Sequence, residues 1–470
     1  MTIQNDKRYL KKSSLISVFG TVSKICGPLL TLLLARLFGS AEFGFFVSSQ
    51  ALLLTLSHSA TLGLDKGLYW YLPQNLANGR LAYHGIMESF WIAIGFSLLC
   101  TAVIFVGASL SIFSSELPWY AVSIVFYAGI FILGSASEGN RHPQYSIFIN
   151  SFLIAVLAPA TSIALHFLHI GHALPLGLFC GQFIGLLLHF ALIRRQFPRM
   201  PIFPPLRISK DLLKYSLPLG FNEFASSFLI RSSLWMVMLF LGSEFAGAYA
   251  IMVTISNGLQ TVRAGYTPIL TPVIASMSQN RLATDLKPTV SYCIFIITTI
   301  QLFIGFFIIL FPTEILLFIG SDYLVQPMSL GILLMIQLLL GFFGMAFVIM
   351  NGIGKSLYTL KMNLFSLAVS GVCGCLFIPR FGLVGAALST LTYNLVQMIW
   401  NNVLLSRRRL WPYANALWNQ IFWIIALIVL YAFLNLGGNS FGLWVRIGIY
   451  AASVVLVGVN FWFMRKKFLV

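Results

Sequence analysis

Long apolar runs are the feature of this sequence that most constrains its fold. Fourteen such runs occur in the 470 residues, and each is close to the length of about 20 residues that a helix needs to cross a bilayer. A transmembrane barrel would instead alternate polar and apolar residues in segments of about 10. We therefore predict an all-α polytopic membrane protein. Its expected spans are residues 14–37, 43–63, 84–107, 118–136, 145–168, 173–193, 214–241, 246–270, 289–311, 325–350, 361–378, 382–405, 415–435 and 443–464.

Charged residues are too few for a water-soluble protein. They make up 9% of the chain, whereas a soluble domain has about 25%, and the 59% of hydrophobic residues also excludes disorder. The net charge of +17 does not indicate a nucleic-acid partner, because the basic residues lie mostly in short loops between spans. The six cysteines lie in apolar stretches without metal-site spacing, so we expect neither a metal nor a cofactor.

The distribution of Lys and Arg predicts the orientation in the membrane. With the N-terminus inside, nearly all of these residues fall in cytoplasmic segments, as the positive-inside rule requires. The exceptions are Arg36, Arg380 and Arg446 in outer segments and Lys24, Arg231 and Arg263 within spans. Both termini are therefore expected in the cytoplasm. The first apolar run has no small-residue cleavage site, so we expect a retained helix.

The two halves of the sequence resemble each other. At a shift of 203 residues, Gly39 aligns with Gly242 and Gly44 aligns with Gly247, at the turn between the first two spans of each half. The shift corresponds to six spans, an even number, so the repeat is parallel and suits a two-lobed transporter. The alternative is that small-residue turns between apolar helices recur by chance.

The repeat predicts four regions along the chain. They are an N-terminal lobe (1–193), a basic, proline-rich cytoplasmic linker (194–213), a C-terminal lobe (214–405) and an appended helical hairpin (406–470). No connection is long enough to fold as a catalytic domain. We therefore do not expect an enzyme.

Four segments resemble those of a known family. They are ARLFGSAEFGFF (35–46), LLKYSLPLGF (212–221), LGSEFAGAYA (241–250) and IPRFGLVGAALST (378–390). They are similar to segments of the Wzx-type polysaccharide-export flippases, whose superfamily also holds MATE exporters and MurJ-type lipid II flippases. The resemblance spans residues of about 10–405 and implies two six-helix bundles around a central cavity. It also implies an undecaprenyl-diphosphate-linked substrate, such as an O-antigen precursor of lipopolysaccharide, in the bacterial cytoplasmic (inner) membrane.

Cationic or titratable side chains occur within four spans. Lys24, Arg231, Arg263 and His58 are predicted to bind the diphosphate in the central cavity, because a charge inside a bilayer is costly and usually faces a polar path. Arg offers a planar fork for phosphate oxygens, and Lys offers a point charge. The alternative is that each cation is neutralised by an interior acid or reaches the membrane surface.

Other polar residues are candidates for supporting roles. Glu223 and Glu88 are available as counter-ions within spans. Asp65 and Lys66, at the end of the second span, form either a gate contact or a solvated helix end. Proline removes a backbone hydrogen bond and kinks a helix. The predicted hinges are therefore Pro28, Pro218 and Pro268.

A flippase is the function that these features favour. It would move the lipid-linked oligosaccharide by alternating access, with glycosyltransferases and a polysaccharide polymerase as expected partners. The alternative is a MATE-like exporter of drugs or metabolites, although exporters of organic cations are expected to have acidic cavities. A membrane polymerase or ligase is less favoured because the outer connections are short. No GxxxxGK[ST] nucleotide loop occurs, so we do not expect direct ATP hydrolysis by this chain. The expected energy source is either a H⁺ or Na⁺ gradient or consumption of the product.

Overall fold

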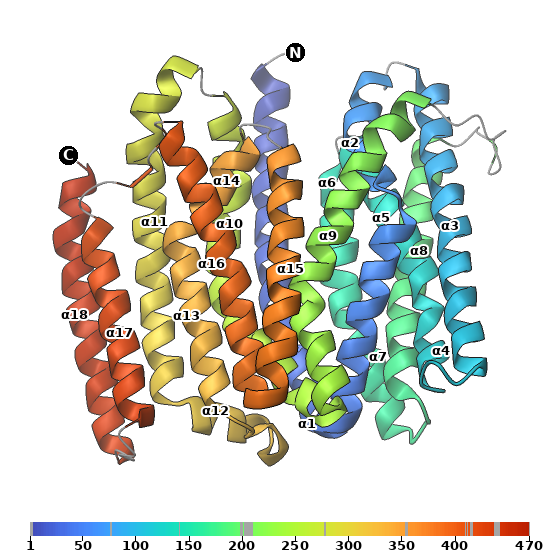
Figure 1. Cartoon of the computed structure of the whole chain (residues 1–470). Coiled ribbons are helices and arrows are strands. Elements are labelled where there is room, and N and C mark those ends of the chain that lie inside the picture. Colours follow the sequence, from blue (N-terminus) through green and yellow to red (C-terminus); the bar gives the residue numbers. More distant parts are fainter. Residues whose placement is uncertain are drawn as a thin grey trace. The chain divides into compact units, whose positions relative to one another are not determined.

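The architecture is that of a computed structural model of the chain. It describes residues 3–75, 78–140, 142–197, 201, 210–276, 279–352, 356–408, 410, 412–413, 417–436 and 442–469. Side chains are described for residues 26–75, 78–140, 142–197, 201, 210–266, 287–288, 290–350, 358–408, 410, 412–413, 417–431, 433 and 442–462. These parts of the chain form helices joined by short turns, with no strand among them (Figure 1).

Every expected span overlaps helical structure, and those at 118–136, 145–168 and 325–350 are each divided between successive helical elements. Ten of the described helices are long and apolar enough to cross a membrane, and Met328–Phe343 and Trp418–Tyr431 are shorter apolar helices. The first two expected spans lie in one helix, α1 (Ile3–Ala60), whose helical geometry is interrupted at Gly39. The eighth expected span lies in α10 (Ser243–Ser276). The prediction of an all-α polytopic fold is therefore confirmed.

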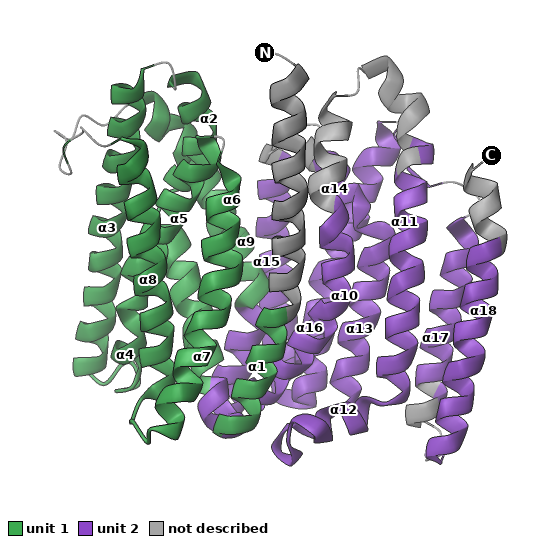
Figure 2. Cartoon of the chain, turned by 180° about the vertical axis from the view of Figure 1, so that it is seen from behind, with its two compact units in different colours: residues 1–38, 45–231 green, residues 39–44, 232–470 purple. Residues whose placement is uncertain are grey.

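The helices pack as two compact units (Figure 2). Unit 1 comprises residues 1–38 and 45–231, and unit 2 comprises residues 39–44 and 232–470. The chain thus passes from one unit to the other inside α1 and again inside α9 (Lys210–Leu241), directly after Arg231. The start of α9 packs with unit 1, although it follows the expected linker at 194–213. The boundaries of the two sequence lobes stay a prediction.

Unit 1 contains short helices as well as spans. Besides most of α1 and the start of α9, its elements are α2 (Leu64–Asn75), α3 (Gly79–Ser109), α4 (Leu117–Ala121), α5 (Ser123–Gly139), α6 (Pro143–Ser146), the π-helix η1 (Ile147–Leu153), α7 (Ile154–Phe167) and α8 (Ala173–Gln196).

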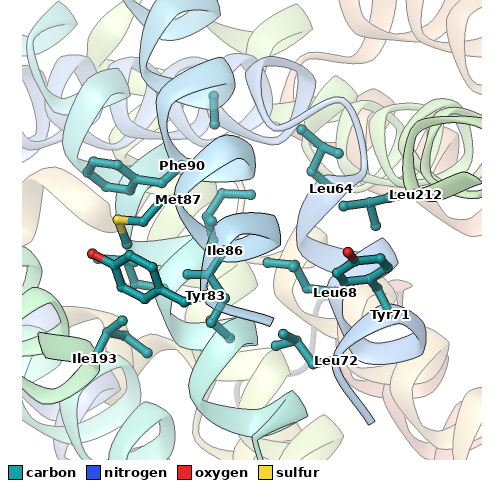
Figure 3. Packing of buried hydrophobic residues seen from close by; sticks show 14 of the residues in the cluster. Leu64, Leu68, Tyr71, Leu72, Tyr83, Ile86, Met87, Phe90, Ile193 and Leu212 are labelled. Carbon is teal, nitrogen blue, oxygen red and sulfur yellow. The ribbon is translucent and has the colours of Figure 1, made fainter. Parts of the chain in front are cut away.

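The hydrophobic core of unit 1 fixes the position of α2. Leu64, Leu68 and Leu72 recur every four residues and form one buried stripe along this helix (Figure 3). The stripe belongs to the same buried cluster as Tyr83 and Ile86 of α3. Side chains four residues apart share a helix face. Packing of this stripe therefore holds the neighbouring residues of α2 at a defined place in unit 1.

Unit 2 holds the remaining helices. They are the end of α9, α10, α11 (Gln279–Leu310), α12 (Pro312–Ile319), the 3₁₀ helix η2 (Ser321–Tyr323), α13 (Met328–Phe343), α14 (Met345–Gly352), α15 (Ser356–Phe381), α16 (Leu383–Arg407), α17 (Trp418–Leu436) and α18 (Leu443–Leu469). The C-terminal pair α17 and α18 packs on α11 and α13. The Tyr431 hydroxyl donates a hydrogen bond to the Met328 carbonyl at 2.7 Å, and the rings of Phe295 and Phe461 stack with their centres 5.4 Å apart.

The aligned glycines of the repeat have matching conformations. Gly39 has φ 77° and Gly242 has φ 94°, a region that glycine enters without steric cost. Within unit 2, a side chain on Gly44 would overlap the Ser243 carbonyl, and one on Gly247 would overlap the Ser40 carbonyl. The glycine of each segment thus contacts the equivalent serine of the other segment, as in a pair related by a two-fold axis. This reciprocal contact supports an internal repeat rather than a chance match.

Candidate functional site

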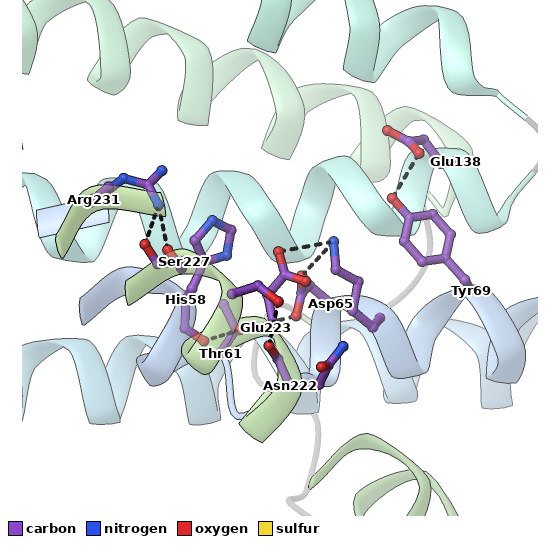
Figure 4. A network of polar contacts seen from close by, with 11 residues as sticks. His58, Thr61, Asp65, Tyr69, Glu138, Asn222, Glu223, Ser227 and Arg231 are labelled. Carbon is purple, nitrogen blue, oxygen red and sulfur yellow. Dashed lines mark hydrogen bonds and ion pairs between the residues drawn. The ribbon is translucent and has the colours of Figure 1, made fainter. Parts of the chain in front are cut away.

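Two helix faces with polar side chains meet in unit 1. The C-terminal part of α1 and the start of α2 contribute one face, and the start of α9 contributes the other. A spacing of four residues places Glu223, Ser227 and Arg231 on one side of α9, and the turn between α1 and α2 brings the first set opposite them. We call this cluster the polar seam (Figure 4). It consists of Thr55, His58, Thr61, Asp65 and Lys66 on the first face and Glu223, Ser227 and Arg231 on the second.

Arg231 carries a positive charge within a membrane-spanning helix. Its Nη1 donates hydrogen bonds to the Ser227 carbonyl at 3.0 Å and to the Ser227 hydroxyl at 2.6 Å. The Ser227 hydroxyl lies 3.4 Å from that of Thr55. Among the side chains that the structure describes, no carboxylate lies within 4.0 Å of the Arg231 guanidinium. Its partners are neutral, so its charge is available to an anionic ligand.

His58 lies in the same row of side chains as Arg231 (Figure 4). Its ring stacks on that of Phe131, with centroids 4.2 Å apart and an interplanar angle of 7°. Its Nδ1 is buried and has no hydrogen-bond partner among the described residues. His58 interacts electrostatically with Asp65, Lys66 and Arg231, the charged residues at the two ends of the seam.

Lys66 joins α2 to α9. Its Nζ lies 3.6 Å from Asp65 Oδ2 and 3.9 Å from Glu223 Oε1. The Asp65 carboxylate also accepts a hydrogen bond from the Thr61 hydroxyl at 3.0 Å, and its side chain is only 3% exposed. Asp65 is therefore not the solvated helix end that one of the two sequence interpretations expects. The other interpretation, a gate contact, stays a prediction, and the ionic contacts of Lys66 with two carboxylates are compatible with it.

Two glycines let the helices of the seam approach each other. Gly63 has φ 74°, and a side chain on it would overlap the Ser216 carbonyl and the Gly220 backbone. A side chain on Gly220 would overlap the backbone of Leu62. The backbone of α9 thus lies directly against the turn between α1 and α2. This close approach brings Glu223 within reach of Lys66.

Aromatic side chains flank the same contact. The rings of Trp70 and Tyr215 stack with their centres 4.6 Å apart. The Tyr69 hydroxyl donates a hydrogen bond to Glu138 Oε2 at 2.7 Å. Burial of Tyr69 and the neighbouring Glu138 charge raise the pKa of this hydroxyl, so it stays protonated and remains a donor. These contacts tie α2 to α9 on one side and to α5 on the other.

Five of the predicted site residues come together in the seam: His58, Asp65, Lys66, Glu223 and Arg231. Sequence analysis missed Thr55, Thr61 and Ser227. The signal that could have identified Ser227 is its position four residues after Glu223 and four before Arg231, on the same face of α9.

The other predicted residues lie elsewhere. Glu88 is buried on α3, where its charge raises the pKa of Tyr71 in addition to the effect of burial. Arg263 belongs to unit 2, and its guanidinium lies against Gly344, between α13 and α14. The side chain of Lys24 lies outside the described residues.

The structure does not assign the hinges to the prolines. The interruption of α1 is at Gly39 rather than at Pro28, and α9 continues as a helix through Pro218. The side chain of Pro268 lies outside the described residues. Hinge roles for the three prolines stay predictions.

The chemistry available to the seam is ionic binding. In the described part of the chain, no group of three or more His, Cys, Asp or Glu side chains is arranged to hold a metal ion. The seam holds two carboxylates, those of Asp65 and Glu223, and its donors are a guanidinium, an ammonium and an imidazole, together with hydroxyl groups. Such donors suit an anion with several oxygens, and Arg in particular binds phosphate with two parallel hydrogen bonds.

Sequence comparison identifies a family. The family model described as "Polysaccharide biosynthesis protein" matches residues 9–279. Among curated proteins, none matches the sequence. The match runs from within α1 to beyond the end of α10 and therefore includes the whole polar seam.

Solved structures of transporters share the fold. The structure of the lipid II flippase MurJ in an inward closed conformation aligns with a TM-score of 0.70 and 13% identity, covering 96% of this chain and 99% of MurJ. An inward-facing multidrug resistance MATE family transporter of the MOP superfamily aligns with a TM-score of 0.61 and 16% identity, covering 83% and 94%. A mutant of the Vibrio cholerae MATE transporter VcmN has a TM-score of 0.56 and 15% identity, covering 86% and 98%. At these identities the likeness is one of fold.

Proposed function

Because this chain belongs to the polysaccharide biosynthesis protein family, we propose that it is a flippase for an undecaprenyl-diphosphate-linked oligosaccharide. It moves this polysaccharide precursor from the inner to the outer leaflet of the bacterial cytoplasmic membrane, with both termini in the cytoplasm. The family match supports a role in polysaccharide biosynthesis, and the flippase-like and exporter-like fold supports transport. The driving force is a H⁺ or Na⁺ gradient, and the protein partners are the glycosyltransferases and the polymerase of the pathway.

The observation that carries this proposal is the charge of Arg231. A lipid diphosphate has about two negative charges, and moving them into a low-dielectric region without a partner is prohibitive. Arg231 lies in a membrane-spanning helix and contacts only neutral groups of Ser227 among the described residues. It can therefore exchange a hydroxyl and a carbonyl for phosphate oxygens without leaving a buried carboxylate unpaired.

Other cations are further candidates in this proposal. His58 lies next to Arg231 in the seam and donates a further hydrogen bond to the diphosphate. Lys24 and Arg263 stay predicted substrate-binding residues, because both are cations within spans. Transport that stays intact after removal of charge at both Lys24 and Arg263, in a well-expressed protein, would contradict their role.

The test is translocation by Arg231 variants. Fluorescent undecaprenyl-diphosphate oligosaccharide is placed in the inner leaflet of proteoliposomes, and its appearance outside is followed over time. A hydrogen bond to a charged group is worth about 1.5–3 kcal/mol, so Arg231→Gln should slow translocation by about tenfold or more. Arg231→Lys, which keeps the charge, should retain part of the rate. Arg446→Gln is the control, because Arg446 pairs with Glu314 outside the seam.

A second candidate function is export of an organic cation. It is favoured by Glu223, a carboxylate that is 32% exposed and lies in the same seam. In that case Glu223→Gln abolishes transport of a lipophilic cation, and Arg231→Gln leaves it intact. The flippase proposal expects no transport of the cation by either variant or by the unmodified protein.

A further inference from the structure

Among the described residues, Lys66 is held by charge alone. The two distances from its Nζ, 3.6 Å to Asp65 and 3.9 Å to Glu223, exceed the 2.7–3.2 Å of N–H···O hydrogen bonds. One positive charge therefore faces two negative charges without a directional bond to either. A contact of this kind is easily exchanged for a better-placed anion.

The two carboxylates are not equivalent. Asp65 is buried and is held in place by the hydroxyl of Thr61. Glu223 is 32% exposed, and Lys66 is its one hydrogen-bond or ion-pair partner among the described residues. Glu223 is therefore the carboxylate that can leave, and Asp65 is the one that stays.

Glu223 and Arg231 lie on one face of α9. They are eight residues apart, which corresponds to about 12 Å along a helix. Between them lies His58, which interacts electrostatically with both Lys66 and Arg231. An anion bound at Arg231 thus places its negative charge in the row that ends at Glu223.

We propose that Lys66 is a further diphosphate-binding residue, and that Glu223 is a placeholder anion that the diphosphate displaces. The inference rests on the proposed function. It adds a binding residue, and it predicts that substrate binding breaks the contact between Lys66 and Glu223. When the diphosphate reaches Lys66, like-charge repulsion drives Glu223 away. The ionic link between α2 and α9 is then lost only while substrate is bound.

The test is a double-mutant cycle on the affinity for undecaprenyl diphosphate in lipid nanodiscs. Glu223→Gln removes the competing anion and should tighten binding by about fivefold, the effect of an ion pair worth about 1 kcal/mol. Lys66→Gln should weaken binding by about fivefold or more. Glu223→Gln combined with Lys66→Gln should bind no tighter than Lys66→Gln alone, because the carboxylate then has no lysine to occupy.

Controls separate exchange from a general effect of charge. Glu314→Gln removes a carboxylate that pairs with Arg446 at 2.9 Å, outside the seam, and should leave the affinity unchanged. Glu223→Ala replaces the glutamine variant if that variant does not fold. Inorganic pyrophosphate is measured in parallel. If the variants change the affinity for pyrophosphate as much as that for undecaprenyl diphosphate, the free anion is sufficient as a ligand. If they change it less, the lipid-linked form is the preferred ligand. Both results agree with exchange.

Contrary outcomes separate the placeholder role from the proposed function. If the unmodified protein binds undecaprenyl diphosphate through Arg231, but Glu223→Gln does not tighten binding, the placeholder role is overturned and the proposed function stands. Tightening of equal size in the Lys66→Gln background also overturns it, because the effect then does not act through Lys66. If no variant or parent binds the diphosphate, the proposed function itself is overturned.

Discussion

Successive residues of α9 take part in two different kinds of polar contact. Arg231 ends the charged seam of unit 1, whereas Ser232 and Ser233 belong to a network of hydroxyl groups in unit 2. The Ser232 hydroxyl oxygen lies 3.1 Å from that of Ser370, and the Ser233 hydroxyl oxygen lies 2.8 Å from that of Thr390. Hydroxyl groups donate and accept, so they satisfy one another in pairs.

The difference indicates separate tasks for the two regions. A hydroxyl network that satisfies itself stabilises packing and has no charge for a ligand. Among the described residues, the arginine of the seam is bound only to neutral groups of Ser227, and its lysine is held by loose ionic contacts. We therefore expect substitutions in the hydroxyl network to change stability and those in the seam to change binding.

Close helix packing is the strongest constraint that both regions share. Gly63→Ala should lower the stability by about 1–3 kcal/mol, because the added methyl group overlaps the backbone of α9 and Gly63 has a left-handed φ. Gly44→Ala should do the same at the Ser243 carbonyl in unit 2. Thermal unfolding in detergent measures both. Gly95→Ala is the control, since nothing lies within 4 Å of the added atom, and an equal loss there would refute the packing argument.

A substitution in the hydroxyl network should change the stability of the protein and leave ligand binding unchanged. Tyr249→Phe removes a buried hydroxyl that lies 2.9 Å from Thr390 and should cost about 1 kcal/mol. The affinity for undecaprenyl diphosphate should not change. Thermal unfolding and nanodisc binding are measured on the same preparation. A lower affinity at unchanged stability would mean that this network, and not only the seam, serves the ligand.

A substitution in the seam should change the affinity for the diphosphate. Ser227→Ala removes the hydroxyl that holds Arg231 at 2.6 Å. Among the described residues, the guanidinium then keeps only its hydrogen bond to the carbonyl of the same residue. Loss of this orientation should weaken diphosphate binding by about threefold, the lower part of the range for one hydrogen bond. Ser232→Ala, five residues further along α9, is the matched control and should leave binding unchanged. Equal effects of the two variants would erase the contrast between the regions.

The smallest effect is expected outside both regions. Glu314→Gln breaks the ion pair with Arg446, in which the glutamate side chain is 45% exposed. Exposed pairs contribute about 0.2–1 kcal/mol, so the unfolding temperature should fall slightly and only at low salt. A large loss of stability would mean that this pair is needed to hold α18 on unit 2.

The sequence was sufficient to predict the helices and the charges within them. Runs of apolar residues have the length that a bilayer requires, and this length is a local property that no tertiary contact has to supply. The turn at Gly39 was likewise predictable, since the same short segment recurs at Gly242. The seam residues His58 and Arg231 stood out because ionisable groups are rare in spans.

The contacts between helices could not be predicted in the same way. Periodicity shows which residues share a face of α9, but not that this face meets α1 and α2. That meeting depends on the close approach at Gly63 and Gly220, which lie far apart in the sequence. The break at Gly39 also resets the helical phase of α1. The burial of Asp65 and the pairing of Lys66 with Glu223 follow from this tertiary contact.

Binding of undecaprenyl diphosphate to Arg231→Gln is the most direct test of the charged seam. The dissociation constant is measured in nanodiscs for the parent and the variant, with uncharged undecaprenol as the comparison lipid. We predict that the variant loses about tenfold or more of its affinity for the diphosphate and none of its affinity for undecaprenol. Equal affinity of parent and variant for the diphosphate would contradict the account.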